Sequence, residues 1–311
     1  MQTILIAIFP LLLIIAMGYI ARRSQWINDA FLDGLSSVTF TVFIPCLLFL
    51  SIYSSEDLTT VSLSLLLSFY LPVISIFIVS FIVYRLCFIK QFQRTELLSL
   101  AATFSNNVLI GIPILLSIIG ESVLLPGFVI VSIHSLILFT LTSLFGSQSQ
   151  GQSSWYRTIG TSLWLTTRSP IVISLILGLV AKLLLIELHP VFTNTLTFLK
   201  GAALPCALIV LGATLARYRV SNRLSLTVAV AGVKLMVLPL CIYLTATQVF
   251  QLSLELTAVA VVMAASPVGI NVFMFAARDQ QASPYLASAI LSSTLLSIIT
   301  IPLWIWFLGL A

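Results

Sequence analysis

The stretch TFSNNVLIGIP, from Thr103 to Pro113, places two asparagines, a glycine and a proline inside a long apolar segment. Proline in the interior of a helix removes a backbone hydrogen bond and clashes with the preceding turn. Backbone groups freed in this way cost several kcal/mol each if they stay unpaired in hydrocarbon. The stretch therefore predicts a helix that is broken where other groups pair with its backbone.

The composition around this stretch is that of a membrane protein. Of the 311 residues, 60% are hydrophobic and 7% are charged, whereas about 25% are charged in a typical globular protein. Ten apolar segments have roughly the 20 residues needed to cross a hydrocarbon core, and none shows the alternating polar face of a barrel strand. We therefore predict an all-α integral membrane protein with ten transmembrane helices. The predicted ranges are 3–21, 36–53, 62–86, 95–119, 123–145, 168–187, 191–216, 224–246, 255–277 and 284–308.

The basic residues indicate how these helices are oriented. Eleven of the 14 lysines and arginines lie near the loops after helices 1, 3, 5, 7 and 9, and the loops after helices 2, 4, 6 and 8 carry none. The positive-inside rule places the first set of loops in the cytoplasm, so both termini are expected on the extracytoplasmic side. Because the basic residues are spread through short loops, we expect no nucleic-acid partner.

Several residues recur about 160 positions apart, which indicates an internal repeat. Each half holds five helices, an odd number, so the second copy enters the membrane from the opposite side. We therefore predict two inverted five-helix repeats, 1–145 and 168–311, joined by a polar linker, 146–167. Inverted repeats are a common plan of secondary transporters. The matched pairs are Pro10 and Pro170, Gly18 and Gly178, Pro45 and Pro205, and Cys46 and Cys206.

The stretch AASPVGIN, 264–271, breaks the ninth segment at the depth where SNNVLIGIP breaks the fourth. If both helices unwind and cross there, the half-helix N-termini and the asparagine side chains can hold an anion. The alternative is that the prolines make packing kinks and the asparagines bond to neighbouring helices. Because the breaks are paired, we favour binding. The candidate substrate-binding residues are Asn106, Asn107, Gly111, Pro113, Ser266, Pro267, Gly269 and Asn271.

Two ionisable residues at membrane depth are candidates for coupling or charge compensation. His134 suits proton coupling, with a hydrogen-bonded packing role as the alternative. Lys234 suits compensation of a bound anion or proton coupling, and its alternative is a bond to backbone carbonyls. The chain has no P-loop, GxSxG or HExxH motif, so neither ATP hydrolysis nor an enzyme is predicted. We expect no cofactor and no metal site. Na⁺ and H⁺ are the candidate coupling ions.

The runs FPLLLIIAMGYIARRSQWI, FIPCLLFLSI, NNVLIGIP and AASPVGINVFMFA resemble the auxin efflux carrier family of membrane transport proteins, and the resemblance covers nearly the whole chain. It implies a ten-helix transporter of the bile-acid/arsenite type, with helices 1, 2, 6 and 7 as a scaffold domain. Helices 3–5 and 8–10 form the transport domain, and the broken helices 4 and 9 cross at the substrate. The resemblance also implies an elevator mechanism and, from plant members, a homodimer.

The short linker is similar to that of bacterial members of this family, which include malonate carriers. This implies a secondary carrier of the bacterial inner membrane for a small organic anion, a mono- or dicarboxylate such as malonate. Asn107 and Val108 stand where many bacterial relatives have a threonine-glycine pair, which changes the shape of the pocket. The alternative from another class is a membrane sensor that binds a ligand without moving it.

Overall fold

The computed structural model describes residues 2–55, 62–88, 94–150, 160, 164, 167–217, 224–272 and 282–310. These residues form helices and short connections, with one isolated antiparallel bridge between Ser105 and Val268. Within this part of the chain, six helices are long and apolar enough to cross a membrane, and three further apolar helices are shorter. The architecture agrees with the predicted all-helical integral membrane protein.

The helices follow the predicted apolar segments in order along the chain. η1, η2, η4 and η5 are π-helical turns, whereas η3 is a 3₁₀-helix. In the first half lie α1 (Gln2–Arg23), α2 (Asp29–Val38), η1 (Thr39–Phe43), α3 (Ile44–Tyr53), α4 (Leu63–Phe88), α5 (Thr95–Thr103), η2 (Asn107–Gly111), α6 (Ile112–Ile118), η3 (Glu121–Val123) and α7 (Leu124–Gln150). In the second lie α9 (Pro170–Leu183), α10 (Pro190–Leu215), α11 (Leu224–Gly232), η4 (Val233–Val237), α12 (Leu238–Leu244), η5 (Thr245–Val249), α13 (Leu254–Ala265) and α15 (Ala282–Phe307).

Three boundaries differ most from the sequence-based expectation. The second predicted helix, 36–53, begins at Asp29, because α2, η1 and α3 form one continuous helix to Tyr53. α9 has 14 residues and ends at Leu183, short of residue 187. Leu185 takes a left-handed φ of 52°, and the Ile186 amide donates to the Ala181 carbonyl at 2.9 Å, which closes the helix as a glycine usually would. α7 continues to Gln150 and so enters the predicted linker.

Parts of two predicted regions, the linker and the ninth helix, lie outside the described residues. From 151 onward the linker is described only at 160, 164 and 167. The ninth predicted helix, 255–277, is described as far as Val272. Five of the basic residues used for the orientation also lie outside: Lys90, Arg157, Arg219, Arg223 and Arg278.

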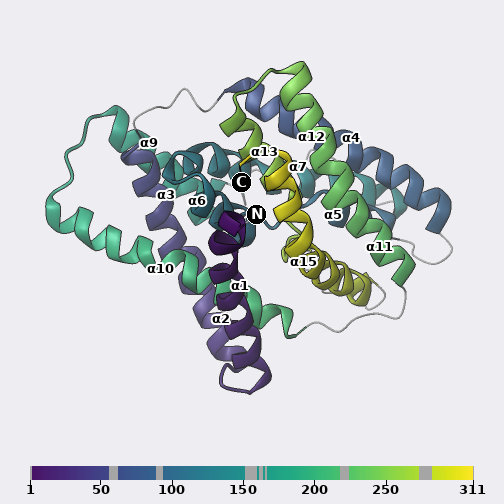
Figure 1. Cartoon of the computed structure of the whole chain (residues 1–311), viewed down its shortest axis with the longest axis horizontal. Coiled ribbons are helices and arrows are strands. Elements are labelled where there is room, and N and C mark those ends of the chain that lie inside the picture. The colour runs from purple at the N-terminus through teal and green to yellow at the C-terminus, as the bar shows by residue number, and fades with distance from the viewer. Residues whose placement is uncertain are drawn as a thin grey trace.

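The helices pack in two groups. In the first group, α1 packs along α10 and α3 packs along α9, while α10 also contacts α3. The helices of the second group pack on one another around the broken segments near Asn107 and Ser266; they are α4, α5, α7, α11, α12, α13 and α15. Figure 1 shows α3, α9 and α10 on the left, with α4, α5, α11 and α12 on the right. An ion pair between Lys200 Nζ of α10 and Glu121 Oε1 of η3, at 2.7 Å, joins the groups.

Glycines let the helices of the first group approach closely. A Cβ atom added at Gly18 of α1 would lie 2.3 Å from the carbonyl oxygen of Ile209 in α10. One added at Gly178 of α9 would lie 2.8 Å from the carbonyl oxygen of Phe49 in α3. Close backbone approach at small residues is a common way for membrane helices to pack. Gly178 follows Gly18 by 160 positions, and Ile209 follows Phe49 by the same number.

Prolines inside the helices free carbonyl groups that other helices pair. Pro72 removes the partner of the Ser68 carbonyl, which accepts a hydrogen bond from Thr245 Oγ1 of η5 at 2.7 Å. Pro239 does the same to the Leu235 carbonyl, which accepts from Trp304 Nε1 of α15 at 2.9 Å. Since no water reaches such groups in hydrocarbon, these side chains are what makes the proline kinks tolerable.

Replacing Trp304 with phenylalanine is expected to lower the free energy of unfolding. The Leu235 carbonyl would lose its donor inside the protein, which costs about 1–3 kcal/mol. The matched control is Trp306→Phe, because Trp306 lies on the same helix but is 60% exposed. Thermal unfolding of the two variants in detergent checks the difference. Equal midpoints would mean that the indole bond to Leu235 contributes nothing.

Candidate functional site

The two broken helices meet through their extended segments. α5 ends at Thr103 and helical structure resumes at Asn107, while α13 ends at Ala265. The Asn106 amide donates to the Pro267 carbonyl at 2.8 Å, and the Gly269 amide donates to the Phe104 carbonyl at 2.9 Å. These bonds flank the bridge between Ser105 and Val268. The segments 104–106 and 267–269 therefore form a short antiparallel pair, which we call the crossing.

Two further helices hold the crossing from outside. The Ser105 amide donates to His134 Nε2 of α7, and the Val268 amide donates to Ser293 Oγ of α15, each at 3.1 Å. Ser293 was not among the predicted site residues. Its signal was present, because Ser293 follows His134 by 159 positions, the spacing that also separates Ser266 from Asn107.

Several buried polar atoms at the crossing have no hydrogen-bond partner within the described part of the chain. Asn106 is 6% exposed and Asn107 is 3% exposed. An unpaired buried polar group costs about 1–3 kcal/mol, so a cluster of them calls for a bound polar molecule. The unpaired atoms are Ser105 Oγ, Asn106 Nδ2, Asn107 Nδ2 and Oδ1, and His134 Nδ1.

Two glycines keep the broken helices in close contact. A Cβ atom added at Gly111 would lie 2.8 Å from Ser266 Oγ and 3.5 Å from Asn107 Oδ1. One added at Gly269 would lie 2.5 Å from the Phe104 ring. The Ser266 hydroxyl is buried and donates to the Val262 carbonyl at 3.0 Å. Gly111 therefore leaves the space in which the Asn107 amide and the Ser266 hydroxyl approach each other.

The structure brings together most, but not all, of the predicted binding residues. Pro113 is buried about two turns of helix beyond Asn106, so it lies beside the crossing and not in it. Asn271 is an exposed residue in the turn that follows the crossing. The residues that the crossing gathers are Asn106, Asn107, Gly111, Ser266, Pro267 and Gly269.

Lys234 is fully buried and its partner is a backbone group. Its Nζ donates a hydrogen bond to the Ala264 carbonyl, in the last turn of α13. The C-terminal end of a helix carries partial negative charge, so an ammonium group there is stabilised. This is the backbone contact that the sequence left open as the alternative to a place beside the substrate. Across the described residues, no three His, Cys, Asp or Glu side chains gather as a metal site requires.

His134 is also buried, with 2% of its surface exposed. Its ring lies among those of Phe69, Tyr70 and Phe104, with centroid distances of 5.7, 6.2 and 4.9 Å. Because Nε2 accepts the Ser105 amide, the proton of the neutral ring is assigned to Nδ1. The ring thus contributes one donor that lacks a partner to the surroundings of the crossing.

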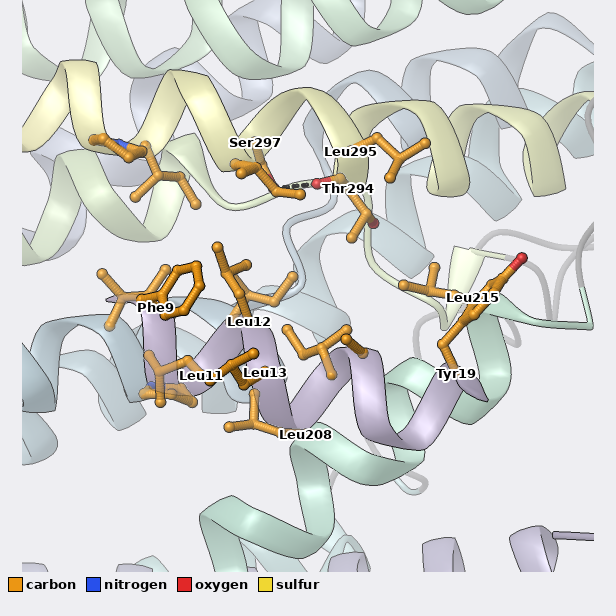
Figure 2. Close-up of a pocket in the computed structure, with 18 of the residues that line it drawn as sticks. Phe9, Leu11, Leu12, Leu13, Tyr19, Leu208, Leu215, Thr294, Leu295 and Ser297 are labelled. Atoms are coloured by element: carbon orange, nitrogen blue, oxygen red, sulfur yellow. Dashed lines mark hydrogen bonds between the residues drawn. The ribbon is translucent and has the colours of Figure 1, made fainter. Parts of the chain in front are cut away.

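A cavity of about 550 Å³ lies beside the crossing, between the two groups of helices. Figure 2 shows it as an elongated space with Leu12 and Leu13 of α1 on one side and Leu295 of α15 on the other. It reaches η2 at Ile110 and α6 at Pro113, and its lining is largely aliphatic. The Thr294 and Ser297 hydroxyls in its wall each donate to a carbonyl of α15 at 2.7 Å. The cavity therefore separates the helix groups with an apolar surface.

The family described as "Membrane transport protein" matches residues 3–305. A protein of Methanothermobacter thermautotrophicus, described as an uncharacterized transporter, is 25% identical over 307 residues, which cover 96% of each chain.

Proposed function

This chain belongs to the membrane transport protein family, which matches residues 3–305, and we propose that it is a secondary active transporter of a small organic anion. The family assignment confirms the resemblance stated from the sequence, and the chain is accordingly an integral membrane protein. The single observation that carries the anion proposal is the set of buried, unpaired polar atoms at the crossing. The inner (plasma) membrane, with both termini outside, is the proposed location.

The chemistry of the crossing favours an anion bound by neutral donors. The asparagine amides provide N–H groups, and the helical segment Asn107–Ile118 begins at the crossing with its partial positive charge. Lys234 is engaged with the Ala264 carbonyl, so the anion is held without it. A carboxylate fits these donors because it accepts several hydrogen bonds. A small mono- or dicarboxylate such as malonate is therefore the proposed substrate.

Equal spacings support a plan of two inverted repeats, 1–145 and 168–311. The glycine contacts of Gly18 and Gly178 are related by 160 positions, and the amide acceptors His134 and Ser293 by 159. In each comparison a contact between two helices recurs between the corresponding helices of the other half. Such recurrence is expected when an inverted repeat builds both halves of one site.

The packing of the helices supports an elevator mechanism. The first group, α1, α3, α9 and α10, is the proposed scaffold domain, and the second group carries the crossing. The cavity between α1 and α15 leaves part of the boundary open, and the exposed Lys200–Glu121 ion pair across it contributes little, about 0–1 kcal/mol. We propose that the second group moves as the transport domain and carries the anion past the scaffold.

The unpaired amides also fit a second candidate, a membrane sensor that binds the anion without moving it. Uptake of labelled malonate and other small carboxylates into proteoliposomes separates the two. Accumulation driven by an imposed pH or sodium gradient is the expected result, and it identifies H⁺ or Na⁺ as the coupling ion. Binding to the purified protein with no uptake under either gradient would favour the sensor.

A further inference from the structure

Each segment of the crossing has one backbone N–H group that donates to a side chain of another helix. The two N–H groups belong to Ser105 and Val268, the residues that face each other in the bridge. Their acceptors, His134 and Ser293, come from α7 and α15 at the same distance of 3.1 Å. Two residues of different chemistry therefore occupy equivalent places and accept the same kind of hydrogen bond.

The hydrogen bond from Ser105 constrains the protonation of His134. An imidazolium carries N–H groups on both nitrogens. The N–H donor of Ser105 would then face a second N–H donor at Nε2 and would have no acceptor. The titratable groups around the ring, Tyr70 and Lys234, are engaged elsewhere. The Tyr70 hydroxyl donates to the Ile130 carbonyl at 2.6 Å, and Lys234 donates to the Ala264 carbonyl. This arrangement keeps the ring as an acceptor.

We propose that His134 and Ser293 are equivalent positioning residues, each of which fixes one segment of the crossing by accepting its backbone N–H. His134 then works in transport as a neutral acceptor and neither takes up nor releases a proton. The inference rests on the proposed function, because positioning matters only if the crossing binds the anion. Loss of either acceptor leaves an amide unpaired in a buried site, so segment 104–106 or 267–269 shifts and displaces the binding groups.

Two substitutions of His134 test whether the residue acts as a hydrogen-bond acceptor, as a packing ring or as a proton carrier. In His134→Gln, the amide oxygen stands as many bonds from Cα as Nε2 does, so the acceptor remains while the titratable ring is lost. In His134→Phe, the ring remains while the acceptor is lost. We expect the KM of the phenylalanine variant to be about tenfold above that of the glutamine variant, the factor for one hydrogen bond.

The pH dependence of uptake is a second measurement, and it would not change if His134 served only in packing. The glutamine variant should keep the wild-type profile. A profile that flattens in this variant would overturn the proposal in favour of proton coupling through His134. Activity retained by His134→Phe and lost by His134→Gln would overturn it in favour of packing.

Amide hydrogen exchange tests the positioning without any substrate. In the purified protein, His134→Phe should speed exchange at Ser105 and Ser293→Ala should speed exchange at Val268, while His134→Gln should leave Ser105 protected. Unchanged protection in both acceptor-free variants would overturn the inference. If no carboxylate is transported, the proposed function fails, and the exchange data still decide whether the two acceptors hold the crossing.

Discussion

Replacing Gly212 with leucine is expected to abolish the folded protein. Gly212 lies where α10 crosses α1, and a Cβ atom added there would lie 1.9 Å from the Ile15 carbonyl oxygen and 2.9 Å from the Tyr19 nitrogen. Both are backbone atoms of a helix, so neither can move aside alone. The whole of α1 would have to separate from α10. Overpacking in a core costs about 1–3 kcal/mol when side chains can adjust, and here the cost should exceed that range.

A glycine on the same helix provides the control. Gly201 of α10 is exposed, and a Cβ atom added there meets nothing within 4 Å. Gly201→Leu should therefore give monodisperse protein with a wild-type unfolding temperature, whereas Gly212→Leu should aggregate or fail to insert. Size-exclusion chromatography and thermal unfolding in detergent make the comparison. Equal yields and equal stabilities would show that α1 and α10 do not pack as closely as described.

The sequence predicted the helices well but not all of their contacts. Apolar segments of membrane length predict helices because hydrocarbon leaves the backbone few alternatives. Gly18 and Gly178 were found because they recur 160 positions apart. Gly212 has no such counterpart, since Ile52 stands 160 positions before it. A repeat reveals only what both copies share, so it missed the closest backbone approach between α1 and α10.

The breaks were also predictable, whereas the pairing of their polar groups was not. Proline and glycine fix where a helix is interrupted, which is why the stretches around Asn107 and Ser266 were identified as partners. The serine of α15 that faces the crossing differs from its neighbour Ser292 in the sequence only by its spacing of 159 positions from His134. The partner of Lys234 depends on where α13 ends in space, and the exposure of Asn271 depends on the direction in which the chain leaves the crossing.

Replacing Asn107 with alanine is expected to remove anion binding while the protein stays folded. Asn107 is 3% exposed, and neither of its amide atoms has a hydrogen-bond partner within the described residues. An asparagine that serves the fold would have such partners. A hydrogen bond to a charged group contributes about 1.5–3 kcal/mol, so the dissociation constant should rise about 10- to 100-fold.

The stability of the same variant distinguishes a binding residue from a structural one. Since the substitution breaks no internal hydrogen bond and removes a buried unpaired amide, the unfolding temperature without substrate should stay the same or rise. The control is Asn194→Ala, an exposed residue of α10, which should change neither affinity nor stability. Wild-type affinity in Asn107→Ala would place the anion elsewhere. A large drop in stability would mean that the Asn107 amide bonds to other helices, and the unpaired groups of the crossing would then no longer argue for a ligand.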